Sequence, residues 1–280
     1  MSQVKQKFIE NNAVSNAKLA QMAQGTVKGN TALSTGNAED ITMTKLLAMM
    51  HAGAWIKDED FGQGTVGTQG YASVVAGAGA SVLGTFIAGV TGIISMATGT
   101  TATGSVVVHD IGTTTKHLAG AGELVCIVKF KLNVLSNATN RFSLRLGFGD
   151  TTTAAADNID SAGYIEYSDN VNSGNWVYCT ASNSTRTKVN STVAPVAITG
   201  DNWMYLKIVC NSAGTQTDFY INNTLLGSIT TNIPTTAGRT FDTKFSIAKS
   251  VGATVTPTLN IDRIYQHYIR SDANSANWRL

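Results

Sequence analysis

The chain has few charged residues and few prolines for its length. Charged side chains make up 14% of its 280 residues, whereas a typical soluble domain has about 25%, and Thr, Ser, Asn and Gly fill the difference. This composition is typical of a β-rich protein at an extracellular or virion surface. The net charge of +2 is spread without basic clusters, and a nucleic-acid-binding domain gathers its basic residues in a patch or stripe. We therefore expect no nucleic acid partner.

Cysteine is scarce and has no metal-binding or disulfide pattern. The three residues, Cys126, Cys179 and Cys210, each lie inside an apolar run. No Cys-x-x-Cys pair or His-bearing spacing typical of a zinc site is present. We expect buried free thiols that act as small apolar groups, no bound metal or cofactor, and synthesis in a reducing cytoplasm.

The sequence also lacks the usual hydrolase patterns. Jelly-roll glucanases carry a Glu-x-Asp-x-x-Glu run on one strand, and retaining glycosidases need two carboxyl groups about 5 Å apart. Neither Asp58-Glu59-Asp60 nor Glu166 with Asp169 reproduces that run. The four histidines lie far apart, and no Gly-x-Ser-x-Gly turn is present. We expect a protein that is not an enzyme.

No segment reads as a signal peptide or a membrane span. Residues 1–12 are polar and charged, where a signal peptide has an apolar region. Residues 74–97 are mostly small and apolar and approach the length of a span. Glycine, Ser and Thr interrupt them, and the alternation suits strands and turns better. We expect no membrane insertion.

The N-terminal segment, residues 1–56, has too little apolar surface to form a core alone. Units below roughly 40 residues usually need disulfides, metals or oligomerisation to fold. Residues 42–53 place an apolar stripe at i, i+3, i+4 and i+7 of a predicted helix, with Thr42 as N-cap and Gly53 as the stop. We expect copies of the chain to supply the missing surface in a homotrimer. The predicted trimerisation residues are Leu19, Met22, Met43, Leu46, Leu47 and Met50.

The same segment resembles a known module. The string Asn16-Ala-Lys-Leu-Ala-Gln-Met22, then Thr26-Val-Lys-Gly-Asn30, then Asp40-Ile-Thr with Leu46-Leu-Ala-Met49, is similar to the N-terminal module of tailed-bacteriophage tail-fibre and related virion-fibre proteins. It departs at Ala23, where such proteins commonly carry proline. The resemblance implies a virion-attached homotrimer that contacts other virion proteins and is assembled in the host bacterial cytoplasm.

Residues 57–280 are patterned as short strands with turn residues between them. Helical patterns are almost absent after Gly53, and several strands at eight-to-fifteen-residue spacing favour a sandwich. The tight turn Asn222-Asn223 predicts a hairpin. The strands are expected at residues 99–109, 123–132, 141–148, 163–167, 175–180, 186–190, 203–210, 217–221, 225–229, 241–248 and 259–269.

The region from residue 61 to residue 270 resembles the concanavalin A-like, or laminin-G-like, jelly roll. The likeness lies in Asn202-Trp-Met-Tyr-Leu-Lys-Ile208, Phe219-Tyr-Ile-Asn-Asn-Thr-Leu-Leu226, Asn232-Ile-Pro234 and Leu259-Asn-Ile-Asp-Arg-Ile264. The predicted fold is therefore mainly β: an antiparallel β-sandwich, preceded by a short extended or helical trimerisation segment. Members of this fold include lectins, hydrolases and structural virion domains, so the fold does not decide the function.

Two features are candidates for ligand binding. Trp176 and Tyr178 share one face of a predicted strand and could stack on a sugar ring, or else fill the sandwich or a trimer contact. The loop carrying Asp150, Asp157 and Asp160 is rich in oxygen ligands, without EF-hand spacing, and is either a solvated turn or a calcium or sugar site.

These patterns predict a non-enzymatic virion fibre whose distal jelly roll attaches to host-surface glycan. The alternative is a stand-alone lectin or a degraded glycan hydrolase.

Overall fold

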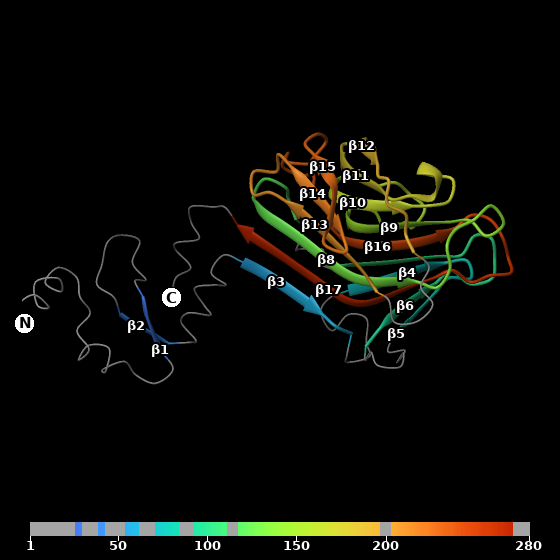
Figure 1. Ribbon diagram of the computed structural model, residues 1–280, viewed down its shortest axis with the longest axis horizontal. Helices are drawn as coiled ribbons and strands as arrows, with labels where there is room; N and C mark the ends of the chain where they lie inside the picture. Colours follow the sequence, from blue (N-terminus) through green and yellow to red (C-terminus); the bar gives the residue numbers. More distant parts are fainter. Residues whose placement is uncertain are drawn as a thin grey trace, which may run out of the picture. The chain divides into compact units, whose positions relative to one another are not determined.

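The computed structural model describes residues 26–29, 39–42, 54–61, 71–83, 92–110, 117–196 and 203–270 of the chain. The chain divides into two compact units, one of residues 1–53 with 276–280 and one of residues 54–275. In the first unit, strand β1 (Thr26–Gly29) pairs antiparallel with β2 (Glu39–Thr42). The second unit contains two sheets packed face to face (Figure 1).

One sheet has seven strands in the order β12-β11-β10-β9-β16-β7-β4, all antiparallel to their neighbours. We call it the seven-stranded sheet. A short 3₁₀ turn, η1 (Asn172–Gly174), lies between β10 and β11. The strands are β4 (Tyr71–Ala76), β7 (Ser105–Asp110), β9 (Phe142–Gly149), β10 (Ser161–Tyr167), β11 (Val177–Ser182), β12 (Thr185–Asn190) and β16 (Asp242–Lys249).

The other sheet, the eight-stranded sheet, has the order β15-β14-β13-β8-β17-β6-β5. Its eighth strand, β3, pairs with the second half of β17, and β6 pairs with the first half. The strands are β3 (Ala54–Glu59), β5 (Ala80–Leu83), β6 (Ile94–Ala97), β8 (Gly122–Leu132), β13 (Met204–Cys210), β14 (Thr217–Ile221), β15 (Thr224–Ile229) and β17 (Thr258–Arg270).

Alternation explains which side chains enter the core. In β9, Phe142, Leu144, Leu146 and Phe148 are at most 1% exposed and belong to the main core between the sheets, because alternate side chains of a strand point to the same face. The β14–β15 hairpin turns through Asn222 and Asn223, whose φ angles of 49° and 65° are positive, as a type I′ turn requires. The predicted antiparallel sandwich is confirmed.

Aromatic rings fill the centre of the core. Trp176 makes an edge contact with Phe130 at 6.1 Å between ring centroids and lies 5.6 Å from Tyr167. All three cysteines are free and buried, as predicted. Burial raises the pKa of Cys210 to about 11, so this thiol stays neutral at ordinary pH.

Several sequence predictions concern residues that the structure does not describe. The six trimerisation residues Leu19, Met22, Met43, Leu46, Leu47 and Met50 all lie outside the described ranges, and so does the predicted helix after Thr42, which is itself the last residue of β2. Within residues 74–97, the described parts include the end of β4 and all of β5 and β6. Across the described residues, no helix is long and apolar enough to cross a membrane.

Candidate functional site

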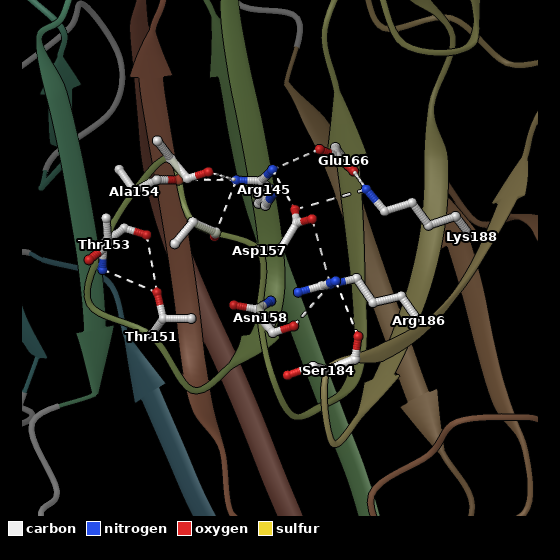
Figure 2. Close-up of polar contacts among 12 residues, drawn as sticks. Arg145, Thr151, Thr153, Ala154, Asp157, Asn158, Glu166, Ser184, Arg186 and Lys188 are labelled. Atoms are coloured by element: carbon white, nitrogen blue, oxygen red, sulfur yellow. Dashed lines mark hydrogen bonds and ion pairs between the residues drawn. The ribbon is translucent and has the colours of Figure 1, made fainter.

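The loop between β9 and β10, residues 150–160, lies against the outer face of the seven-stranded sheet (Figure 2). Its Ala154 is buried against Val107 of β7 and Ala248 of β16. Arg145, which points outward from β9, donates from Nη1 to the carbonyl oxygens of Ala154 and Ala155, at 3.2 Å each. These contacts hold the loop down on the sheet.

Ion pairs surround Arg145 on this face. Its Nη2 lies 2.8 Å from Asp157 Oδ1 in the loop and 2.9 Å from Glu166 Oε1 on β10. Lys188 of β12 reaches the other oxygen of Glu166 at 2.7 Å. Glu166 is only 3% exposed, and a buried carboxylate without these cations would be strongly destabilising.

Lys244 of β16 is a second buried cation under the loop. It is 2% exposed, and its Nζ donates to Asn158 Oδ1 at 3.1 Å, Thr151 Oγ1 at 3.3 Å and Thr153 O at 3.4 Å. Burial, with the nearby positive charge of Arg145, lowers the pKa of Lys244 to about 8. Its donors are directed to the loop, so this lysine also anchors the loop.

The three predicted carboxylates serve the same loop. Asp150 accepts a hydrogen bond from the Ile159 amide at 2.8 Å, and burial raises its pKa. Asp157 pairs with Arg145, and Asp160 accepts from the Asn183 amide at 2.8 Å. Among the described residues, no group of three or more His, Cys, Asp or Glu could hold a metal ion. The structure accounts for these carboxylates as groups that fix the loop.

The predicted sugar-stacking pair lies in the core. Trp176 is 0% exposed and Tyr178 is 7% exposed, and the Tyr178 ring packs 5.2 Å from that of Phe219 on the opposite sheet. Both side chains point between the sheets, so neither offers a free ring face to a sugar. The stacking interpretation is therefore wrong, and the alternative, that the two rings fill the sandwich, is correct.

The outer face of the eight-stranded sheet is open and hollowed. A hollow of about 470 Å³ lies over β8, β13 and β17. Tyr205 of β13 is 45% exposed, and Tyr265 of β17 is half-buried. The hollow is lined by Ile127, Lys129, Tyr205, Asp262, Arg263 and Tyr265.

Strand register brings these residues together. Tyr265 of β17 pairs with Ile127 of β8. Two residues further along β8, Lys129 pairs with Arg263 of β17 on one side and with Tyr205 of β13 on the other. The register of β17 against β8 shifts between Ile261 and Arg263. Such a bulge places an extra residue in one strand and re-aims its side chain, and the extra residue here is Asp262.

The charges around the hollow are paired and partly exposed. Lys129 Nζ lies 2.6 Å from Asp262 Oδ2 and 5.0 Å from the Trp203 ring centroid. Arg263 Nε donates to Asp58 Oδ1 at 2.8 Å, and this hydrogen bond lowers the pKa of Asp58. Fixed donors and acceptors therefore stand beside two tyrosine rings and an apolar floor.

Sequence reasoning missed this hollow. The signal was available in part, because Tyr205 alternates with the buried Met204 and Leu206 and so must point outward. The hollow itself needs β8 and β17 as neighbours, and these strands are distant in sequence.

The chain matches a protein family. Residues 89–262 match the family described as SO2946-like, C-terminal domain. The crystal structure of SO2946, a protein of unknown function from Shewanella oneidensis MR-1, aligns with a TM-score of 0.54 at 16% identity, covering 85% of this chain and 98% of that chain. This likeness shows the fold. No curated protein sequence matches the chain.

Two further structures align at lower similarity. A structure of botulinum neurotoxin type C, whose cell entry depends on two ganglioside molecules, has a TM-score of 0.47 at 14% identity, over 82% of this chain and 51% of that chain. The carbohydrate recognition domain of Emp47p has a TM-score of 0.48 at 5% identity, over 78% and 96%. The family match, which spans more than half of the chain, makes this protein a member of the SO2946-like C-terminal domain family.

Proposed function

We propose that this protein is a homotrimeric virion fibre protein of a tailed bacteriophage, and that its sandwich attaches to glycan on the host surface. The virion role is supported by the N-terminal motif at residues 16–22, 26–30 and 40–49. In this proposal the N-terminal segment contacts other virion proteins and trimerises, and the protein is assembled in the host bacterial cytoplasm.

The hollow on the eight-stranded sheet carries the glycan-binding proposal. Ligand sites are concave, with apolar and aromatic walls and a few placed polar groups. Tyr205 and Tyr265 supply ring surface, and Ile127 supplies an apolar floor. The Lys129–Asp262 pair supplies a donor and an acceptor at the edge. The hydroxyl groups of a sugar fit these polar groups, and its C–H faces fit the rings.

A binding assay with one variant and one control tests the site. The purified full chain is applied to an array of bacterial surface polysaccharides, and the bound polysaccharide is then titrated by calorimetry. We expect Tyr205→Ala to weaken binding at least about tenfold, as loss of a central aromatic anchor does. The control, Val75→Ala, removes a similarly exposed apolar side chain (49%) from the other sheet and should bind normally. Equal binding by Tyr205→Ala and wild type would contradict the site.

The protein binds glycan without cutting it in this proposal. Asp262 is the one carboxylic residue that lines the hollow in the described part of the chain, and a retaining glycosidase needs two carboxyl groups about 5 Å apart. Incubation with the bound polysaccharide should release no reducing ends. Release of oligosaccharides by wild type, abolished in Asp262→Asn, would replace adhesion by hydrolysis.

Assembly state tests the fibre role independently. Light scattering of the full chain should give three times the chain mass. In a trimer, three weak sites on one fibre would increase avidity by roughly 10²-fold or more where geometry allows. A monomer in solution would favour a stand-alone lectin instead.

A further inference from the structure

A buried pair of opposite charges links the two sheets. Lys57 points inward from β3 of the eight-stranded sheet, and Asp110 points inward from the end of β7 in the seven-stranded sheet. Lys57 Nζ lies 2.9 Å from Asp110 Oδ1, and the two side chains are 5% and 4% exposed. Amine and carboxyl are thus held in contact, away from solvent.

The surroundings of this pair are aromatic or already engaged. Lys57 Nζ lies 3.9 Å from the ring centroid of Tyr71. The Gln266 amide donates to the Tyr71 hydroxyl and accepts from Thr243 Oγ1 at 2.5 Å. The second oxygen of Asp110, Oδ2, is buried and has no hydrogen-bond partner among the described residues. An ion pair in such a place recovers little of its desolvation energy, so chemistry that removes both charges is favoured.

A second carboxyl group is buried on the same strand as Lys57. Glu59 lies two residues after Lys57 on the same face of β3, is 4% exposed, and accepts the Phe61 amide at Oε1, at 2.9 Å. The pKa of Tyr71 is raised mainly by burial. The negative charges of Asp110 and Glu59 raise it further. Lys57 contacts the Tyr71 ring, and Glu59 holds the backbone amide of Phe61, whose ring centroid lies 6.4 Å from that of Tyr71.

We propose that Lys57 and Asp110 condense into an intramolecular amide bond once the chain has folded. The ammonium first gives a proton to the carboxylate, so that both groups become neutral. The Nζ lone pair then forms a bond to Asp110 Cγ, the bond from Cγ to one carboxyl oxygen breaks, and that oxygen leaves as water. The products are one amide and one water molecule, and no oxidant or reductant takes part.

Glu59 carries protons in this step. The attacking nitrogen must lose a proton and the leaving hydroxyl must gain one, and a carboxyl group can accept the first and donate the second. Contact within a rigid core replaces an intermolecular encounter, for which effective molarities reach about 10⁵–10⁸ M. When the released water leaves the buried site, the reverse reaction, hydrolysis of the amide, is prevented.

The bond would join the two sheets covalently near the start of the sandwich. β3 is the first strand of the unit that begins at Ala54. A pull on the N-terminal side of this unit would then pass through the amide bond into β7. The amide bond requires neither glycan binding nor the virion role.

Intact-mass and peptide mass spectrometry of the folded full chain test the bond. We expect a mass lower than that of the sequence by one water, and a branched proteolytic peptide that joins the β3 and β7 segments through Lys57 and Asp110. Glu59→Gln keeps the shape of the side chain and should restore the full mass while circular dichroism stays β-rich. The control, Lys129→Met, removes a cation from the partly exposed pair with Asp262 and should still lose water.

Two results would overturn the proposal or part of it. A folded wild-type chain of full sequence mass, with separate β3 and β7 peptides, would show that the pair remains an ion pair. A branched peptide in Glu59→Gln at the wild-type yield would remove Glu59 from the reaction. Because the first result is read on the wild type, it does not depend on any variant folding.

Discussion

The two sheets treat their outer faces in opposite ways. On the seven-stranded sheet, the loop of residues 150–160 covers charged side chains such as Arg145 and Lys244, which are 7% and 2% exposed. On the eight-stranded sheet, Tyr205 and Arg263 stand exposed beside a hollow. On the seven-stranded sheet, the charged side chains bind the protein's own loop. On the eight-stranded sheet, the charged side chains around the hollow remain accessible to a ligand. A face rich in polar groups is therefore not necessarily a binding face. Its polar groups must also be exposed to solvent.

The largest loss of stability should come from a substitution on the outer face of the seven-stranded sheet, which the loop of residues 150–160 covers. Arg145→Met removes the cation beside Glu166, which is 3% exposed, and loss of one partner of a buried pair costs about 3–5 kcal/mol. Chemical denaturation should show a drop in unfolding free energy of that order. A drop below about 1 kcal/mol would mean that the loop and Lys188 support Glu166 without Arg145.

On the open face, the effect should fall on binding and leave stability nearly intact. Tyr205→Ala removes a side chain that is 45% exposed, and surface substitutions usually change the unfolding free energy by less than about 0.5 kcal/mol. Glycan affinity should fall at least about tenfold. Thermal unfolding and calorimetric titration of the same samples separate the two effects, and a large loss of stability would place Tyr205 among structural residues.

The covered face also predicts a pH dependence. The pKa of Lys244 is lowered from 10.5 to about 8, so between these values the unfolded chain binds more protons than the folded one, and this group's contribution to stability rises with pH. Other groups titrate in the same range, so the comparison is with Lys244→Met. The stability of wild type relative to this variant should increase from pH 8 to 10.5 and stay level below pH 8. A flat difference would show that folding does not lower the pKa of Lys244.

The smallest effect should come from the exposed ion pair at the edge of the hollow. Arg263 and Asp58 are 58% and 39% exposed. Surface ion pairs contribute about 0–1 kcal/mol to the free energy of unfolding, and salt screens this attraction. Arg263→Ala should therefore lower the unfolding free energy by less than about 1 kcal/mol, and less still in high salt. A loss comparable to that of Arg145→Met would erase the contrast between the two faces.

Much of the fold followed from local pattern. The alternation in residues 142–148 and the Asn222-Asn223 turn predicted a strand and a hairpin, and both are present. Prediction of the site was less successful, and Trp176 and Tyr178 show why. Strand β11 is buried on both faces, since the neighbouring Val177 and Cys179 pack against Tyr164 on the outer side. With both faces apolar, alternation cannot tell which one enters the core.

By itself, the sequence determined the sandwich class, the burial of the three thiols and the outward direction of Tyr205, because these depend on residue type and a period of two along a strand. Only the tertiary structure decided that Asp150, Asp157 and Asp160 fix a loop, that Tyr205 meets Tyr265 and Ile127 around one hollow, and that Lys57 touches Asp110. The physical reason is distance along the chain. Strands β3, β7, β8, β13 and β17 become neighbours through sheet order and sheet packing, and no local pattern encodes which side chains such neighbours bring together.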